Sequence, residues 1–408
     1  MAANLAPSIR EIREQFPSLA DGFVYMDNAG GTQVPAAVIE AMRDYMRTSF
    51  VQIGADYPAS QRATENVALA HDFIDTLMGG ENAGRAILGN SSSGLFRMLA
   101  DCYADILSPG DEIVVAENGH EANISPWLHL AARGFKVRMW SIEPDSGRCT
   151  VESLQNLLNS KTRLVVFPHA SNILGEVESL EPIVQAVHHV DAKVVVDGVA
   201  YAPHLPMKVA EWGVDWYGFS CYKVFGPHMA ALWGSHAAQA ELTGPNHSIV
   251  PRNDIPYKFE LGGVNHEGCA GLRAVADHFA FLAGHDSFSR SAVDDAMTVV
   301  PEIESNLTER LLGFLAQCPA VRIIGPANAG KGRLPIISFV HESRSSKEIV
   351  DEIANHGIGI RWGNFYSYRL LERMGIDIDQ GVVRASLAHY NSVEEVDRLI
   401  SAFKPILA

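Results

Sequence analysis

Val194-Val195-Val196-Asp197-Gly198 is the first of the two most informative stretches of this chain. The second stretch, Ser220-Cys221-Tyr222-Lys223, follows one predicted helix and one predicted strand later. An apolar run that ends in an aspartate is typical of a buried parallel strand. The carboxyl ends of such strands lie at the sheet edge where open α/β proteins bind ligands. Lys223 also follows an apolar run, so we expect its amine to lie near the Asp197 carboxylate at one edge of a parallel sheet.

The chain on both sides of these segments alternates short apolar runs with longer amphipathic stretches, a pattern that indicates βα units and an α/β fold. The pattern predicts a seven-stranded, mostly parallel sheet. Its expected strands are Arg85–Leu88, Glu112–Val115, Lys136–Trp140, Thr162–Phe167, Lys193–Val196, Trp216–Ser220 and Ala230–Trp233.

After Gly268 the pattern changes to a long helical stretch, followed by mixed strands and helices. We expect strands at 321–324 and 334–340 and helices at 347–356 and 393–403, which would form a smaller α+β domain. The predicted division is a large domain over residues 21–269 and a small domain made of residues 1–20 and 270–408.

Composition narrows the functional classes. The 408 residues include 48 acidic and 32 basic side chains, a formal charge of −16 without a basic run, so nucleic acid is not expected as a partner. We expect neither a membrane segment nor a signal peptide, and therefore a cytoplasmic protein. The five cysteines form no CxxC pair and the histidines form no HExxH motif, so we expect free thiols and no metal site.

Asp197 and Lys223 are the two groups that pyridoxal phosphate requires. The amine of Lys223 would hold the cofactor aldehyde as a Schiff base, and the carboxylate of Asp197 would keep the ring nitrogen protonated so that the ring accepts electrons. Either residue alone is more often a helix cap or a surface lysine. Their shared position at a sheet edge favours the cofactor.

Two further segments fit the same cofactor. Gly89-Asn90-Ser91-Ser92-Ser93-Gly94 lies between a predicted strand and a predicted helix, where free backbone N–H groups bind phosphate. We therefore expect Ser91 and Ser92 to be phosphate ligands, although serines at helix starts are often only caps. His120, in Asn118-Gly119-His120-Glu121-Ala122-Asn123, is a candidate to stack on the pyridine ring and assist proton transfer.

Six ordered motifs, spread over nearly the whole chain, resemble the class V aminotransferase family. The most similar group is that of the SufS-like group II cysteine desulfurases and selenocysteine lyases. The motifs are Tyr25-Met26-Asp27-Asn28-Ala29-Gly30, His120-Glu121-Ala122-Asn123, His169-Ala170-Ser171-Asn172-Ile173-Leu174-Gly175, Val196-Asp197-Gly198, Ser220-x-x-Lys223 and Arg384-Ala385-Ser386. The resemblance implies a pyridoxal-phosphate enzyme of fold type I and a homodimer whose active site lies near the subunit interface.

The resemblance also implies roles for individual residues. His120 would stack on the ring, and the residues that contact the cofactor would be Ser91, Ser92, His120, Asn172, Asp197, Ala200, Ser220, Tyr222, Lys223 and Gly263. The substrate would lie beside Ala29, Gly30, Asn172, Arg361 and Arg384. Asn172 and Arg384 would hold its carboxylate, for which a bidentate guanidinium is suited.

The sequence departs from the desulfurase pattern at four positions. Tyr366, in Arg361-Trp362-Gly363-Asn364-Phe365-Tyr366, stands where desulfurases carry the catalytic cysteine. Ala200, Gly263 and Tyr222 replace a glutamine, a threonine and a histidine. A tyrosine hydroxyl cannot attack sulfur as a thiolate does, so persulfide formation is not expected here. Cys221 matches a family glycine and is expected to be buried and inert.

The remaining residues predict β-elimination on a cysteine conjugate, a cysteine sulfoxide or cystine, which is a C–S lyase reaction. Catalytic roles would fall to Lys223, His120 and Tyr366, with Tyr366 or Tyr57 as the acid for the leaving group. The alternatives are an epimerase, since the isopenicillin N epimerase group is also similar, an aminotransferase, or a desulfurase that uses another thiol. A cofactor-binding protein without activity is a further alternative, which the retained Arg384 disfavours.

Overall fold

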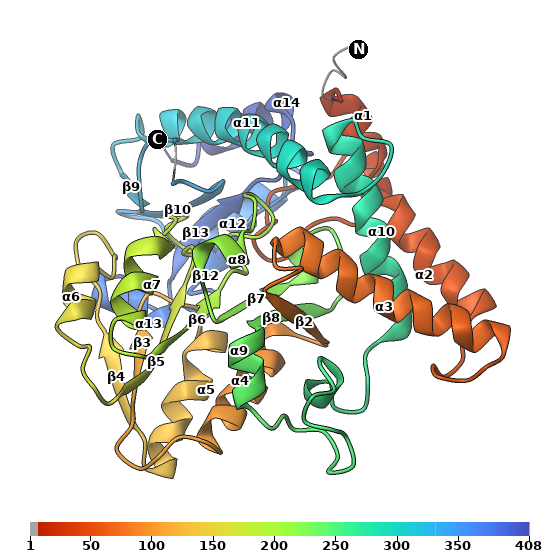
Figure 1. The fold of residues 1–408 in the computed structure, drawn as a ribbon. Coiled ribbons are helices and arrows are strands. Elements are labelled where there is room, and N and C mark those ends of the chain that lie inside the picture. The colour runs from red at the N-terminus through yellow and green to blue at the C-terminus, as the bar shows by residue number, and fades with distance from the viewer. Residues whose placement is uncertain (1–6, 331, 408) are drawn as a thin grey trace.

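The computed structural model, which describes residues 7–330 and 332–407, contains a large seven-stranded sheet with the strand order β2-β8-β7-β6-β5-β3-β4 (Figure 1). The pairs β2–β8 and β7–β8 are antiparallel and the other four pairs are parallel, so the prediction of a mostly parallel α/β sheet is confirmed. The strands are β2 (Gly84–Gly89), β3 (Glu112–Ala116), β4 (Lys136–Trp140), β5 (Thr162–Pro168), β6 (Lys193–Asp197), β7 (Trp216–Ser220) and β8 (Ala230–Ser235).

Alternate residues of these strands enter two separate apolar cores. Val194 and Val196 of β6 pack with the helices on one face of the sheet, and Val195 packs with those on the other. Burial on both faces explains the unbroken valine run, because a strand with one wet face would alternate with polar residues. The helices are α1 (Ile9–Glu14), α2 (Ala36–Thr48), α3 (Pro58–Met78), α4 (Ser92–Ala104), α5 (Ser125–Leu128), α6 (Val151–Gln155), α7 (Leu180–His188), α8 (Val209–Trp212), α9 (His236–Glu241), α10 (His266–Ala283), α11 (Arg290–Leu315), α12 (Ser346–Ala354), α13 (Tyr368–Arg373) and α14 (Val393–Phe403).

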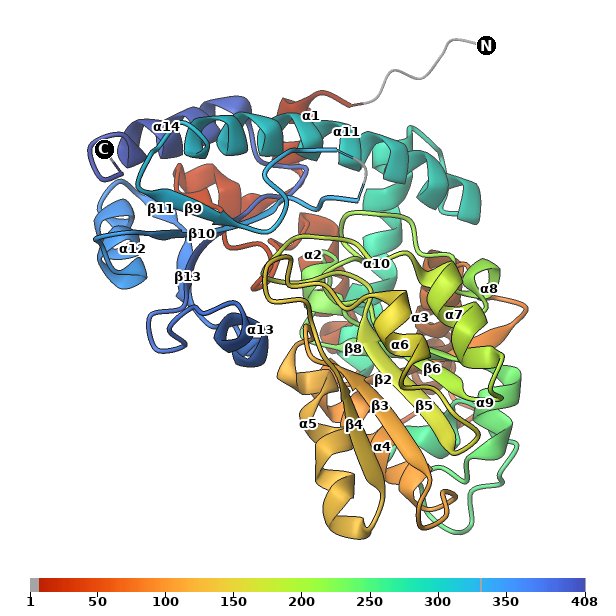
Figure 2. The same ribbon diagram turned by 90° about the vertical axis from the view of Figure 1, so that its left-hand side faces the viewer.

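A second, antiparallel sheet with the order β12-β13-β10-β9 lies above the large sheet in Figure 2, together with α11, α12 and α14. Its strands are β9 (Val321–Ile324), β10 (Ile336–His341), β12 (Arg361–Gly363) and β13 (Val382–Ser386). The sequence pattern predicts β9 and β10 but neither β12 nor β13. The pairing of those two strands places Arg361 directly opposite Arg384.

The predicted domain boundaries fall at places where the structure is continuous. The boundary at 269/270 lies inside α10, and the two-residue strand β1 (Val24–Tyr25), expected in the large domain, pairs with β11 (Ile358–Gly359) near the small sheet. The N-terminal segment contacts the C-terminal helix through an ion pair of 2.9 Å between Arg13 and Glu395. The domain division therefore stays a prediction.

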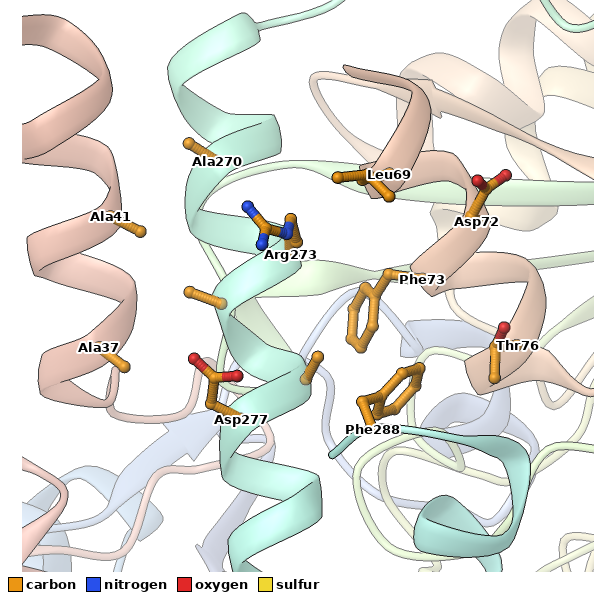
Figure 3. A pocket seen from close by; sticks show the side chains of 12 residues that line it. Ala37, Ala41, Leu69, Asp72, Phe73, Thr76, Ala270, Arg273, Asp277 and Phe288 are labelled. Carbon is orange, nitrogen blue, oxygen red and sulfur yellow. The ribbon is translucent and has the colours of Figure 1, made fainter. Parts of the chain in front are cut away.

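A hollow of about 410 Å³ lies among α2, α3 and α10, lined by alanines, by Phe73 and Phe288, and by Arg273 and Asp277 (Figure 3). It contains none of the residues predicted to carry chemistry. Within the described ranges no helix has the length and hydrophobicity needed to span a membrane. The same residues contain no cluster of three or more His, Cys, Asp and Glu side chains arranged to hold a metal ion.

Candidate active site

A cavity opens at the carboxyl edge of the large sheet, where β6 and β7 end side by side. These two strands are parallel, so Asp197 at the end of β6 and Lys223, in the 3₁₀ turn that follows β7, lie at the same edge. Both line the cavity, as the two sequence segments predicted. The complete lining is Ser92, Ser93, His120, Ala122, Pro168, Ala170, Asn172, Asp197, Val199, Ala200, Ser220, Tyr222 and Lys223.

Asp197 is a buried carboxyl without a cationic partner in contact. Its side chain is 5% exposed, and Oδ1 accepts a hydrogen bond of 2.9 Å from the N–H of Val199. Burial raises the pKa of Asp197 to about 6, against the opposing influence of the Val199 N–H and of Lys223. A positively charged ring nitrogen placed in the cavity would compensate this desolvation.

The amine of Lys223 is desolvated and lies close to other cations. Burial, followed by the charge of Arg384, lowers the pKa of Lys223 to about 8, while Asp197 and Asp27 act in the opposite direction. A larger fraction of the amine is therefore neutral near physiological pH than for an ordinary lysine. Neutral amine is the form that attacks an aldehyde.

The phosphate end of the cavity lies at the first turn of α4. Ser92 and Ser93 line the cavity there, and Ser92 Oγ is 2.9 Å from Ser220 Oγ. Ser91 is the N-cap of α4, because its hydroxyl accepts the N–H of Gly94 at 3.1 Å. Together they provide hydroxyl groups and free helix N–H groups at the position expected for an anion.

Tyr222 lines the same region of the cavity. Its ring stacks on His228 at a centroid distance of 5.0 Å, and its carbonyl accepts the N–H of Thr32 at 3.1 Å. The ring position is therefore fixed from outside the cavity by a neighbour from the same segment.

His120 is held in one orientation by its own turn. Its Nδ1 accepts the N–H of Ala122 at 3.0 Å, which leaves Nε2 as the protonated nitrogen of a neutral ring. Burial, followed by the charges of Lys223 and Arg384, lowers the pKa of His120 to about 4. The imidazole therefore stays neutral at physiological pH, as an aromatic ring that stacks on a cofactor should. Tyr366 packs against it with ring centroids 5.2 Å apart.

Arg384, on β13, is almost completely buried beside the cavity. Its Nη2 pairs with Asp27 Oδ1 at 3.2 Å, and its Nη1 donates to the carbonyl of Asn172 at 3.2 Å. Its Nε has no hydrogen-bond partner although it is buried. Arg361 shares the same carboxylate, because its Nε lies 2.9 Å from Asp27 Oδ2. A single aspartate thus separates two guanidinium groups.

The segment 364–367 covers this arginine. The ring of Phe365 lies over the guanidinium of Arg384, with Cζ 3.7 Å from the ring centroid. Phe365 and Tyr366 both have left-handed backbone angles, with φ values of 50° and 58°. Asn172 holds the segment, since its Nδ2 donates to the carbonyl of Phe365 at 3.1 Å and its Oδ1 accepts Ser367 Oγ at 2.8 Å.

The structure brings most predicted residues into one region and leaves a few apart. Ser92, His120, Asn172, Asp197, Ala200, Ser220, Tyr222 and Lys223 line the cavity. Arg384, Arg361 and Tyr366 reach it through their contacts with Asn172, Asp27 and His120. Outside the lining are Ser91, Gly263, Tyr57, Ala29 and Gly30.

Gly263 faces a different cavity, which it shares with Asn90, Phe50 and His266. Ala29 donates its N–H to Ser386 Oγ at 2.8 Å, and a Cβ on Gly30 would come within 2.9 Å of Asp27 Oδ2. These two residues therefore shape the surroundings of Asp27.

The sequence pattern assigned no role to Ser93 or Asp27, and it indicated Phe365 only as a candidate aromatic pocket residue, not as a neighbour of Arg384. Ser93 had a readable signal, because it is in the same serine run as Ser91 and Ser92. Asp27 and Phe365 act through contacts with Arg384, which is more than three hundred residues from Asp27 in the chain. No local pattern reports such a contact.

The cavity fits pyridoxal phosphate. Lys223 would hold the aldehyde, the otherwise unpaired Asp197 the ring nitrogen, and Ser92, Ser93 and Ser220 the phosphate. The buried Asp197 carboxylate lacks a cationic partner in contact, which the ring nitrogen would provide. The first turn of α4 has free N–H donors, whose hydrogen bonds the phosphate would accept. Fold and site together define a pyridoxal-phosphate enzyme of fold type I.

Comparison with known proteins identifies the family. Residues 24–399 match the model of the aminotransferase class-V family. The chain is 37% identical to the aminotransferase-like protein FGM3 of Gibberella zeae, over 98% of both proteins. It is 30% identical to the cysteine desulfurase-like protein ustD of Aspergillus flavus, over 98% of this chain and 90% of that protein.

Comparison with solved structures supports the same family. The cysteine desulfurase CsdA from Escherichia coli superposes with a TM-score of 0.84 at 25% identity, covering 99% of this chain and 100% of that chain. The chain belongs to the class V aminotransferase family, and it is a cysteine desulfurase-like member that uses pyridoxal phosphate. The resemblance inferred from the six motifs is confirmed.

Proposed function

We propose that this enzyme is a C–S lyase that removes a sulfur substituent from Cβ of a cysteine-derived amino acid, such as an S-conjugate, a sulfoxide or cystine. In this reaction the Cα–H and Cβ–S bonds break. The sulfur leaves as a thiol from an S-conjugate, as a sulfenic acid from a sulfoxide, and as a persulfide from cystine. The remaining unsaturated amino acid hydrolyses to pyruvate and ammonium. Bound pyridoxal phosphate supplies the electron acceptor for the pair released at Cα.

The observation that carries this proposal is a cavity with a lysine, a carboxylate and a histidine but no thiol. None of the five cysteines lines it, four are buried, and Cys318 lies in the smaller core with β9 and α14. Burial raises the pKa of Cys221, the cysteine nearest Lys223 in the sequence, far above its usual value. A desulfurase that uses another thiol is therefore disfavoured.

The residues of the site supply what the elimination requires. Arg384 binds the substrate carboxylate through its unpaired Nε–H, and it is near enough to Lys223 for its charge to lower the pKa of that amine. Lys223 then removes the Cα proton, a step that its lowered pKa favours because the amine is more often neutral. Asp197 would hold the ring nitrogen of the bound cofactor as a carboxylate, and His120 would stack on its ring.

Tyr366 is the residue we propose as the acid for the leaving sulfur. Its ring packs on His120, which lines the cavity, and the residue is 70% exposed, so Tyr366 lies between the site and solvent. Neither tyrosine is in the cavity lining, but Tyr366 contacts His120, which is, whereas Tyr57 is the N-cap of α3. Tyr366 is therefore preferred over Tyr57.

The test incubates the holoenzyme with L-cysteine, L-cystine and several S-substituted cysteines while pyruvate is measured. We expect pyruvate from at least one of these compounds. The Tyr366→Phe variant should be slowed by about tenfold for S-alkyl leaving groups, which need a proton, and less for S-aryl groups, which leave as stable thiolates. Tyr368→Phe on the same segment is the control. Absence of pyruvate from every compound would refute the proposal.

Transamination is the second candidate, because the relative with 37% identity is called aminotransferase-like. It uses the same Lys223 and Arg384 but returns the proton to the cofactor instead of expelling sulfur. The two reactions differ in their products. A keto acid that retains the sulfur substituent indicates transamination, whereas pyruvate and free thiol indicate elimination.

We further propose a homodimer in which the partner completes the site. Several large apolar side chains are exposed between α2 and α3 and in the segment 249–261: Phe50, Ile53, Tyr57, Ile249 and Leu261. Exposed apolar side chains in this number favour an interface. Phe50 shares its cavity with Gly263, one of the residues predicted to contact the cofactor. Sedimentation of the holoenzyme should give twice the chain mass of 44.4 kDa. The cytoplasmic location also stays a prediction.

A further inference from the structure

Arg384 has an unusually complete set of neighbours. Asp27 takes Nη2, the carbonyl of Asn172 takes Nη1, and the ring of Phe365 covers the guanidinium at 3.7 Å. Only Nε is buried and unpaired. The guanidinium has five N–H donors and these contacts use two of them, so the wholly unpaired Nε–H remains available to a new partner.

Phe365 adopts a backbone conformation that its side chain disfavours. Its φ is 50° and that of Tyr366 is 58°, so two consecutive residues with side chains lie in the left-handed region. Such residues persist where their surroundings determine them, and they concentrate at ligand-binding positions. Here both ends of the Asn172 amide fix the segment, through Phe365 and Ser367.

Burial strengthens the contact between the Arg384 guanidinium and the Phe365 ring. The Arg384 side chain is only 3% exposed, and burial lowers its pKa to about 10 although Asp27 opposes this change. A desolvated cation over an aromatic face is attracted more strongly than one in water. The ring also excludes water from the guanidinium, so a carboxylate that reaches Nε binds to an N–H donor that is already desolvated.

We propose that Phe365 is a positioning residue that orients Arg384 and thereby determines that the enzyme selects substrates with a free α-carboxylate. Its ring fixes the guanidinium plane, and Asp27 and Asn172 hold Nη2 and Nη1, so one carboxylate binds at the unpaired Nε–H. Esters and amides of the same amino acid lack the required charge. This inference rests on Arg384 as the carboxylate-binding residue, as proposed above.

The experiment measures equilibrium binding rather than turnover. L-alanine and L-alaninamide, neither of which carries a β-leaving group, are titrated into the holoenzyme while the absorbance of the bound cofactor is followed. The wild type should bind alanine at least about tenfold more tightly than the amide. Phe365→Leu should reduce this ratio by about fivefold, and Phe365→Tyr should keep it within about twofold, because the tyrosine retains the aromatic face.

Two further variants separate positioning from folding. Tyr368→Leu removes the ring that lies 4.9 Å from Arg369 on the same segment and should leave the ratio unchanged. Phe365→Gly suits the left-handed backbone, so it should fold and bind cofactor as the wild type does and still lose the discrimination. Cofactor content is measured for each variant.

The outcomes are distinguishable. A wild type that does not prefer alanine to the amide overturns both the role of Arg384 and that of Phe365. A wild type that prefers alanine, together with Phe365→Leu and Phe365→Gly variants that retain the full preference, overturns the role of Phe365 alone.

Discussion

The two sides of the active site are built differently. The cofactor side consists of the ends of adjacent parallel strands and the first turn of a helix, with Asp197, Lys223 and Ser92 at regular positions. The substrate side consists of a strand pair in the smaller sheet and a segment with two left-handed residues, held by Asp27 and Asn172. We infer that the regular side supplies the common chemistry, and the irregular side the selectivity.

This difference predicts that substitutions on the cofactor side affect every substrate, whereas those on the substrate side affect recognition while the cofactor stays bound. Four substitution or titration experiments examine it, beginning with the largest expected effect.

On the cofactor side, Lys223→Ala should lower turnover by at least about 10³-fold for all substrates, because the variant loses both the cofactor attachment and the base. The absorbance of the lysine-bound cofactor should disappear in the same protein. Lys208→Ala, which removes an exposed amine paired with Glu211, is the matched control and should retain both properties. Persistence of either property in Lys223→Ala would overturn the assignment.

On the substrate side, Arg384→Lys should lower kcat/KM by about 10²-fold, because an ammonium cannot replace the planar group that spans Asp27, Asn172 and a carboxylate. Cofactor content should remain that of the wild type. The comparison between the two sides fails if this variant loses cofactor, or if kcat/KM falls equally for an amino acid and its amide.

Gly198 tests how closely the cofactor side is packed. A Cβ at this position would approach the ring of Tyr217 to within 2.0 Å, next to Asp197. Gly198→Ala should therefore lower the free energy of unfolding by about 1–3 kcal/mol. Gly313→Ala, in α11 with no atom near the added methyl, should raise it by about 0.5–1 kcal/mol. Denaturant titration of both variants provides the measurement, and equal effects would contradict the packing argument.

The pH dependence of cofactor loading tests the electrostatics of the cofactor side. Lys223 must be neutral to attack the aldehyde, and its pKa is lowered to about 8, first by burial and then by Arg384. The loading rate of the apoenzyme should rise about tenfold per pH unit below the pKa and level off above it. A rate that continues to rise up to the ordinary lysine pKa of about 10.4 would show that Lys223 is not perturbed.

The same contrast explains what the sequence could predict. All seven strands of the large sheet were anticipated to within two residues at their ends, because runs such as Val194–Val196 are buried on both faces. Asp197 and Lys223 were placed at one edge because parallel strands share that edge. The sequence can predict the cofactor side because the position of each residue there depends on the local pattern of the strand that precedes it.

The substrate side depends on contacts between distant segments. β13 has only five residues, and its Arg384 contacts Asp27, from the N-terminal segment, and Asn172, from the turn that follows β5. Neither the short strands β12 and β13 nor the left-handed Phe365 has a local signature, since Phe365 is held there by Asn172. The six-motif resemblance could assign Arg384 to a carboxylate but gave no role to Phe365.

The most direct test of the central claim identifies the carbon product formed from one S-substituted cysteine. The account predicts pyruvate and free thiol in equal amounts, with ammonium as the third product. Alanine together with sulfur bound to the protein would instead indicate desulfuration, and a D-amino acid or a keto acid that retains sulfur would indicate epimerisation or transamination. Any of these three results in place of pyruvate would contradict the account.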